Sequence, residues 1–187
     1  DIRAFHSTRS IKRSVRTAEG MAARREDDQT AKRLIDSFEI DIIALGGYMS
    51  DITLNRCVNV HPADLSISLP DGERKFVGDH AVEDAISAGE KVLRSSTLYT
   101  DEGVDSGPLL TVSDPIPVTL PESLETLIKN RERFAMVAGE HQERLKEAGD
   151  WKIFPRTIEM ISRGRFALDD KDRVYVDGRP LPDGYRE

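Results

Sequence analysis

The stretch Cys57-Val58-Asn59-Val60-His61-Pro62 is a short apolar run that carries an amide and an imidazole two residues apart and then meets a proline. If Cys57–Val60 is a strand, Asn59 and His61 project from the same side of it, because side chains alternate along a strand. Pro62 disfavours helix at His61, so the strand ends there in an extended or turned conformation. The pair therefore lies at the carboxyl end of a buried strand, where open α/β sheets bind their ligands.

Two chemical roles suit this pair. An asparagine amide donates hydrogen bonds to a developing oxyanion, and a histidine carries a proton near neutral pH. The alternative is that both side chains only satisfy backbone groups at a strand end. A second segment, Asp105-Ser106-Gly107-Pro108, forms a turn between two apolar stretches. Its aspartate could hydrogen-bond His61, fix the imidazole tautomer and stabilise its protonated form, although alone Asp-x-Gly-Pro is an ordinary turn.

Taken together, Asn59-x-His61-Pro62 followed by Asp105-x-Gly107-Pro108 resembles the glycinamide ribonucleotide formyltransferase family. Members of that family, and relatives that act on other amines, use an Asn, a His and an Asp in this order. The resemblance implies that Asn59, His61 and Asp105 are catalytic. It also implies formyl transfer from 10-formyltetrahydrofolate to a substrate amine, with glycinamide ribonucleotide in purine biosynthesis as the favoured acceptor and no metal ion.

Further positions follow from the same resemblance. Gly47-Tyr48-Met49 matches a family segment that lines the folate pocket, and the loop that delivers Asp105 lies on the folate side of the site. The expected folate-binding residues are Tyr48, Met49, Thr100, Asp101 and Val104. The expected residues for the amine substrate are His80, Glu140, Gly107 and Pro108. The alternatives stay open: core packing for Tyr48 and Met49, the first turn of a surface helix for His80, and a solvated helix face for Glu140.

Composition narrows the class of protein. The 187 residues contain 34 acidic and 27 basic side chains, a net charge of −7, which argues against a general nucleic-acid binder. Cys57 is the only cysteine, so no disulfide framework or cysteine-built zinc site is available. No membrane-length apolar run or signal-peptide pattern is present, so we expect a cytoplasmic location. The partner is expected to be a small-molecule amine, with a phosphoribosyl compound favoured and a homodimer left open.

Periodicity predicts alternating helices and strands. A helix is expected to begin at Glu26, and a second helix is expected at Val82–Ala88. A buried strand is expected at Ile40–Leu45, and further strands at Val92–Thr100, Leu109–Val112 and Ile116–Val118. A long helix is expected to open at Pro121, followed by a helix at Thr157–Ser162 and a hairpin with a tail over residues 165–187. The basic segment 1–25 is expected to be a solvated surface or an anion site.

The expected fold is a single α/β domain over residues 1–187, with a mainly parallel twisted central sheet and helices on both faces. It resembles the formyltransferase form of the Rossmann-like class, lacking the family's first βαβ unit and its glycine-rich phosphate loop. Two departures stand out: Ser50–Arg56 is short for a crossover between parallel strands, and Gln142–Lys152 reads as an insertion.

Three alternative functions remain. The acceptor could be a nucleotide-sugar amine or methionyl-tRNA, although the acidic charge speaks against the tRNA. The reaction could be hydrolysis of formyltetrahydrofolate. A different class is a truncated, catalytically silent chain that binds folate or a partner subunit.

Overall fold

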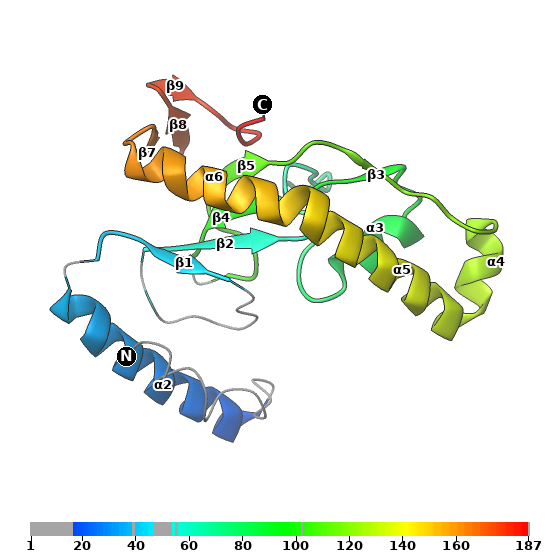
Figure 1. Ribbon diagram of the computed structural model, residues 1–187, viewed down its shortest axis with the longest axis horizontal. Helices are drawn as coiled ribbons and strands as arrows, with labels where there is room; N and C mark the ends of the chain where they lie inside the picture. Colours follow the sequence, from blue (N-terminus) through cyan, green and yellow to red (C-terminus); the bar gives the residue numbers. More distant parts are fainter. Residues whose placement is uncertain (1–16, 39, 47–53, 55, 102, 187) are drawn as a thin grey trace.

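The centre of the molecule is a four-stranded sheet of order β1-β2-β4-β5 (Figure 1). The computed structural model describes residues 17–186 except 39, 47–53, 55 and 102. The strands are β1 (Ile43–Leu45), β2 (Cys57–His61), β4 (Ser96–Tyr99) and β5 (Leu109–Val112). β1 runs parallel to β2, whereas β4 pairs antiparallel with both β2 and β5. The predicted α/β class is confirmed, and the pairing among the described strands is mixed.

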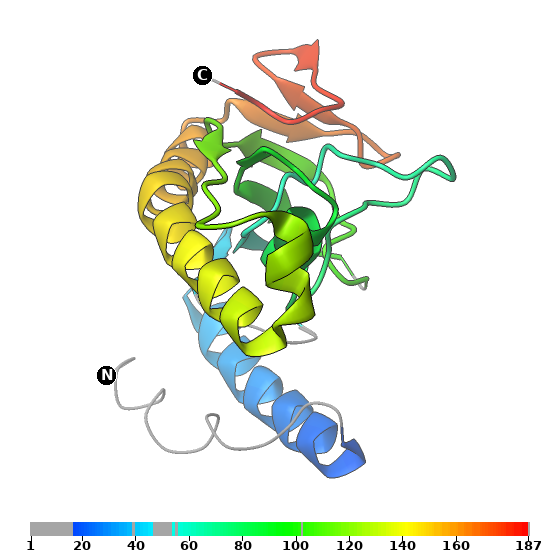
Figure 2. The ribbon, with the colours of Figure 1, turned by 90° about the vertical axis from the view of Figure 1, so that its right-hand side faces the viewer.

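One long helical rod lies across a face of this sheet (Figure 2). It consists of α5 (Arg131–Leu145), a π-helical turn η1 (Lys146–Asp150) and α6 (Trp151–Ser162). The sequence predicts one helix from Pro121 and a separate one at Thr157–Ser162. The structure instead starts α5 after Asn130, whose side chain accepts a hydrogen bond from the backbone of Arg133 at 3.1 Å. The shorter α4 (Leu124–Lys129) precedes it.

A buried cluster of threonine hydroxyls fixes α6 to the sheet. Thr157 Oγ1 lies 2.9 Å from Thr97 Oγ1 on β4 and 2.9 Å from Thr111 Oγ1 on β5. All three residues are buried, so the hydroxyls satisfy one another where water cannot reach. On the opposite face, Leu65 packs against Leu98 and other buried side chains of β4 and β5.

The remaining elements surround this core. They are α2 (Ala18–Ser37), α3 (Ala81–Ser87), the strand pair β3 (Val92–Leu93) and β6 (Ile116–Pro117), and a sheet of β7 (Phe166–Leu168), β8 (Val174–Val176) and β9 (Arg179–Pro180). The helix predicted from Glu26 begins at Ala18, because the Thr17 hydroxyl accepts from the backbone of Gly20 at 3.0 Å. The strand predicted at Val92–Thr100 is divided into β3 and β4. The predicted hairpin is confirmed as β7 and β8.

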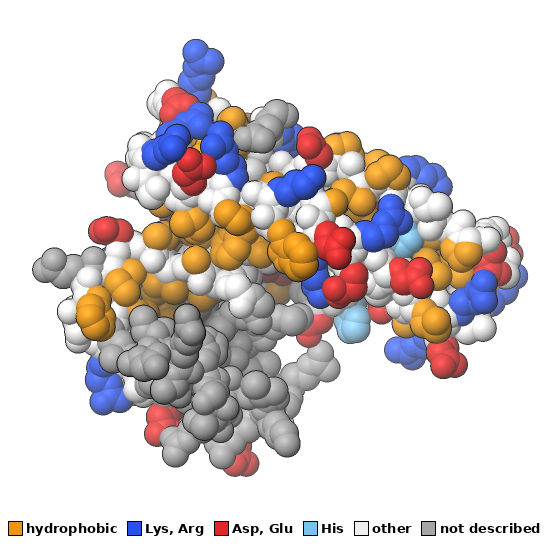
Figure 3. Space-filling model, in the orientation of Figure 1, with side chains coloured by type: hydrophobic (Ala, Val, Ile, Leu, Met, Phe, Trp, Pro, Cys, Tyr) orange, Lys and Arg blue, Asp and Glu red, His pale blue; other side chains and the backbone are white. Residues whose placement is uncertain are grey.

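Hydrophobic side chains also reach the surface along the rod (Figure 3). Trp151, the first residue of α6, is 68% exposed, and Phe154, Ile158 and Ile161 on the same helix are half-buried. Among the described residues, none of the helices combines the length and the apolar character needed to cross a bilayer.

Candidate functional site

The imidazole of His61 lies at the carboxyl end of β2. Cys57 and Val58 anchor the start of this strand in the core with no exposed surface. Asn59 pairs with Leu98 and His61 with Ser96 across the antiparallel ladder, so both side chains leave the strand on one side. The strand ends at His61, before Pro62, where the sequence predicts its end.

Asp105 contacts this histidine from a loop more than forty residues away. Asp105 Oδ2 lies 3.3 Å from His61 Nδ1, and the two side chains are only 13% and 7% exposed. The same oxygen accepts a hydrogen bond from the backbone of Gly78 at 2.8 Å. The carboxylate is therefore held against one edge of the imidazole, as the two-part sequence pattern predicts.

The Asp105 loop is tightly constrained. Asp105 has φ of 51°, a left-handed backbone conformation that aspartate tolerates at a cost of about 1–2 kcal/mol. Asp101 Oδ1 accepts hydrogen bonds from Gly103 N at 3.0 Å and Ser106 Oγ at 2.8 Å. A Cβ atom at Gly107 would overlap the carbonyl oxygen of Tyr99, so only glycine fits there. The fixed loop gives Asp105 a single approach to His61.

Burial sets the charge state of the imidazole. Removal of His61 from water lowers its pKa below the ordinary value, and this is the largest effect. The carboxylate of Asp105, the carbonyl of Phe76 and the carboxylate of Asp150 oppose it, while the charge of Arg74 adds to it. His61 is therefore a neutral imidazole at neutral pH, able to accept a proton.

Three buried polar atoms near this imidazole have no hydrogen-bond partner among the described residues. They are His61 Nε2, Ser95 Oγ and Asp150 Oδ1. Burial raises the pKa of the Asp150 carboxyl, opposed by the polar contact of the Ser95 hydroxyl, which lacks the geometry of a full hydrogen bond, and by His61. Because unpaired buried polar atoms are rare and costly, this cluster is suited to a polar ligand or an ordered water molecule.

The π turn explains how Asp150 reaches this place. Asp150 is the last residue of η1. Gly149 before it packs so closely against Ser95, the residue that precedes β4, that a Cβ at Gly149 would overlap the Ser95 hydroxyl. π-helical turns often occur at functional sites, because the extra residue redirects a side chain. Asp150 is not among the residues that the sequence predicts for the site. The signal available was its position just before Ile153-Phe154-Pro155, where the family resemblance resumes.

Two of the four predicted substrate residues, Glu140 and His80, have exposed side chains. Glu140 is exposed on α5, ten residues before Asp150, which places it about 15 Å away along a helix axis. His141 beside it is structural: its Nε2 accepts from the backbone of Thr119 at 3.0 Å. His80 is also exposed, and its Nδ1 lies 3.5 Å from Glu83. Asp150, whose charge acts on His61, is the acidic residue that the rod brings to this site. His80 follows two residues after Gly78, whose backbone binds Asp105.

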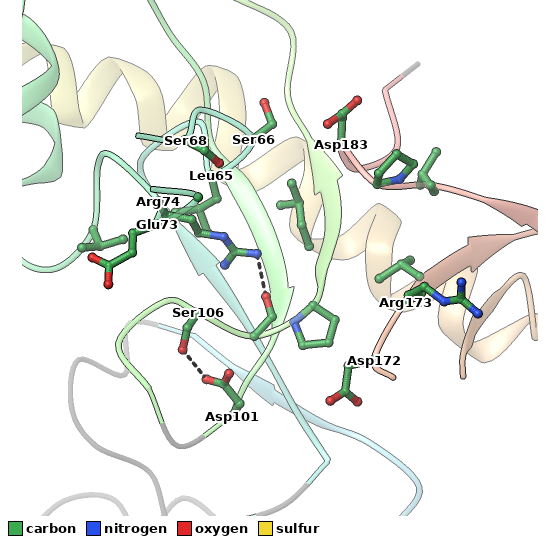
Figure 4. A pocket seen from close by; sticks show the side chains of 18 of the residues that line it. Leu65, Ser66, Ser68, Glu73, Arg74, Asp101, Ser106, Asp172, Arg173 and Asp183 are labelled. Carbon is green, nitrogen blue, oxygen red and sulfur yellow. Dashed lines mark hydrogen bonds between the residues drawn. The ribbon is translucent and has the colours of Figure 1, made fainter. Parts of the chain in front are cut away.

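The predicted folate residues are only partly described. Tyr48 and Met49 lie outside the described residues. Thr100 follows β4, where its backbone donates to the carbonyl of Cys57 at 2.9 Å. Asp101 and Val104 line a cavity of about 910 Å³, together with Gly107 and Pro108, which the resemblance predicts for the amine substrate (Figure 4). His61 is not among the residues that line this cavity.

No group of three metal-ligating side chains occurs within the described ranges. The side chains around His61 suit acid–base and hydrogen-bond chemistry. The site presents a neutral imidazole held on one side by a carboxylate, an amide two residues before it on the same strand face, and unpaired polar atoms beside it.

Comparison with known proteins gives the family. The family model described as formyl transferase matches residues 4–139. A phosphoribosylglycinamide formyltransferase of Haemophilus influenzae is 26% identical over 164 residues, which is 84% of this chain and 66% of the relative. The chain thus spans just under two thirds of that relative's length.

Solved structures show the same fold. The phosphoribosylglycinamide formyltransferase of Coxiella burnetii is similar at a TM-score of 0.59 and 24% identity, covering 87% of this chain and 69% of that one. A formyltetrahydrofolate deformylase of Pseudomonas syringae is similar at a TM-score of 0.51 and 20% identity, covering 81% of this chain and 45% of that one. On the match over residues 4–139, the chain belongs to the formyl transferase family.

Proposed function

We propose that this chain carries the catalytic centre of a folate-dependent formyltransferase that formylates a small amine, with glycinamide ribonucleotide as the favoured acceptor. The observation that carries this proposal is the buried contact between His61 Nδ1 and Asp105 Oδ2 at the end of β2, in a chain of the formyl transferase family. The relatives named phosphoribosylglycinamide formyltransferase support the choice of acceptor.

The reaction assigns a role to each residue. The amine nitrogen bonds to the formyl carbon of 10-formyltetrahydrofolate, the bond from that carbon to N10 breaks, and the amine's proton ends on N10. The Asn59 amide donates to the formyl oxygen as it gains negative charge, a contribution of roughly 3 kcal/mol for such donors. Neutral His61 accepts the amine's proton and passes it on, while Asp105 holds the ring and stabilises its charged form.

The unpaired atoms suit the acceptor side of this reaction. An amine or a ribose hydroxyl could donate to Asp150 Oδ1, and Ser95 Oγ and His61 Nε2 would gain partners at the same time. Asp150 therefore takes the substrate-contact role that the sequence suggested for Glu140. Tyr48, Met49, Thr100, Asp101 and Val104 remain the proposed folate contacts, in a protein proposed to work in the cytoplasm without a metal ion.

A product analysis tests the proposal. The natural full-length protein is given 10-formyltetrahydrofolate with and without glycinamide ribonucleotide, and the products are separated by mass. Formylated amine formed only when the amine is present is the expected result. Formate released without any amine would instead assign hydrolysis, which the similarity to a formyltetrahydrofolate deformylase makes the second candidate. If neither product forms, the enzyme assignment is overturned and a binding role is left.

A further inference from the structure

Arg74 forms hydrogen bonds with the backbone of the Asp105 loop. Its guanidinium donates through Nη1 to the carbonyl oxygen of Asp105 and through Nη2 to that of Gly107 at 2.7 Å. These two carbonyls flank Ser106, so one planar group holds both ends of the turn. Burial lowers the pKa of Arg74, opposed by Asp101 and Asp105, and an arginine in these surroundings stays protonated.

A small hairpin presents this arginine. Ser68 and Arg74 form an antiparallel bridge, and Lys75 N donates to the carbonyl of Ile67 at 2.9 Å. The turn closes at Gly72, which has φ of 91° and donates to the carbonyl of Leu69 at 2.9 Å. Arg74 therefore starts from an ordered backbone, and its side chain is not a loose surface arm.

The chain that follows Arg74 reaches the same pair of catalytic groups. Phe76 is buried, and its carbonyl acts on His61. Gly78 N donates to Asp105 Oδ2, the oxygen that also faces His61 Nδ1. Residues 74–78 thus contact Asp105 at its carbonyl and at its carboxylate. They also supply the Phe76 carbonyl that acts on the imidazole of His61.

We propose that Arg74 is a positioning residue that holds the Asp105 loop so that one carboxylate oxygen faces His61. This inference rests on the proposed formyl transfer for its kinetic consequence, but its geometric consequence is independent of any activity. Without the guanidinium, the left-handed Asp105 loses the group that spans its turn, and its carboxylate moves from the imidazole. A displacement of about 1 Å at such a group lowers turnover by about 10²-fold.

The variants are Arg74→Ala, which removes both hydrogen bonds, and Arg74→Lys, which keeps the charge but cannot span two carbonyls. The matched control is Lys129→Met on α4, an exposed cation far from this hairpin that loses its 3.0 Å ion pair with Glu125. In the natural full-length protein, Arg74→Ala should lower kcat about 10²-fold with the KM for the amine nearly unchanged. Arg74→Lys should fall in between, added guanidinium should restore Arg74→Ala, and Lys129→Met should match the wild type.

A magnetic resonance titration of His61 separates positioning from simple charge. The groups that act on this imidazole are Asp105, Asp150, Arg74 and the carbonyl of Phe76. Loss of the Arg74 charge alone would raise the pKa of His61. Withdrawal of Asp105 would lower it, and this effect is the larger of the two. We expect Arg74→Ala to lower the pKa of His61 and to shift the Gly78 amide proton upfield.

A raised pKa of His61, or a pKa and a Gly78 amide both unchanged, would overturn the positioning role. If Arg74→Ala does not fold, the same two resonances in Arg74→Lys decide the question, because the lysine retains the charge. If the wild type shows no formyl transfer, the proposed function is overturned. The two resonances would still test whether Arg74 positions Asp105.

Discussion

His61 is an imidazole that the fold keeps neutral. Burial lowers its pKa, so between its native value and about 6.5 the unfolded chain binds a proton that the folded chain does not. Stability conferred by the neutral ring is therefore fully present above about pH 6.5 and is lost as the pH falls below it. In the proposed mechanism the same neutral form accepts a proton, so acid should weaken activity and stability together.

This leads to a prediction for His61→Gln. The wild type should lose stability between pH 6.5 and 5 more steeply than the variant, by at most about 1.4 kcal/mol per pH unit for one proton. Denaturant unfolding at a series of pH values measures both slopes. Equal slopes in the two proteins would show that burial does not depress the pKa of His61.

Asp150 illustrates what residue types alone do not reveal. The pair Glu140-His141 looks like a functional motif in the sequence, yet Glu140 is exposed and His141 accepts a hydrogen bond from the backbone of Thr119. Asp150 looks ordinary, yet its Oδ1 is buried without a partner. The difference arises from a π turn, whose register cannot be counted from a 3.6-residue period.

At the scale of elements, the rod of α5, η1 and α6 brings Asp150 to the sheet. Gly149 allows this approach, because a Cβ there would overlap the Ser95 hydroxyl and lie 3.3 Å from Leu145 Cδ1. Gly139 on the same rod has open space around it. The two glycines therefore form a matched pair, one required by packing and one not.

We predict opposite effects for the two alanine substitutions. Gly149→Ala should lower the free energy of unfolding by about 1–3 kcal/mol through overpacking. Gly139→Ala should raise it by about 0.4–1 kcal/mol, because alanine restricts the unfolded chain and favours helix. Denaturant midpoints at one pH test both. A Gly149→Ala protein as stable as Gly139→Ala would show that the rod does not press on Ser95.

Some elements follow from local chemistry and others do not. The end of β2 at His61 and the β7–β8 hairpin were predicted, because Pro62 and a polar four-residue turn act locally. The continuity of α5 into α6 was not predicted, because Pro155 ordinarily ends a helix. In the structure, packing of Thr157 on Thr97 and Thr111 keeps the helix in place. Tertiary contacts outweighed propensity at that point.

At the scale of the whole molecule, the site is assembled from segments far apart in the chain. His61 ends a central strand, Asp105 comes from the loop between β4 and β5, and Asp150 comes from the helical rod. The Asn-His-Asp part was predicted because its two-part motif resembles that of a known family. The contributions of Arg74 and Asp150 were not, since each depends on a fold-wide approach that spacing in the sequence does not encode.

We propose that this assembled site transfers formyl groups, with His61 acting mainly on the transition state. The most direct measurement compares wild type and His61→Ala in the natural full-length protein, following formyl transfer to the amine and the affinity for a non-reacting folate analogue. We predict that turnover falls by about 10²–10⁴-fold while the folate affinity is nearly unchanged. A His61→Ala protein that keeps full formyl transfer would contradict this account.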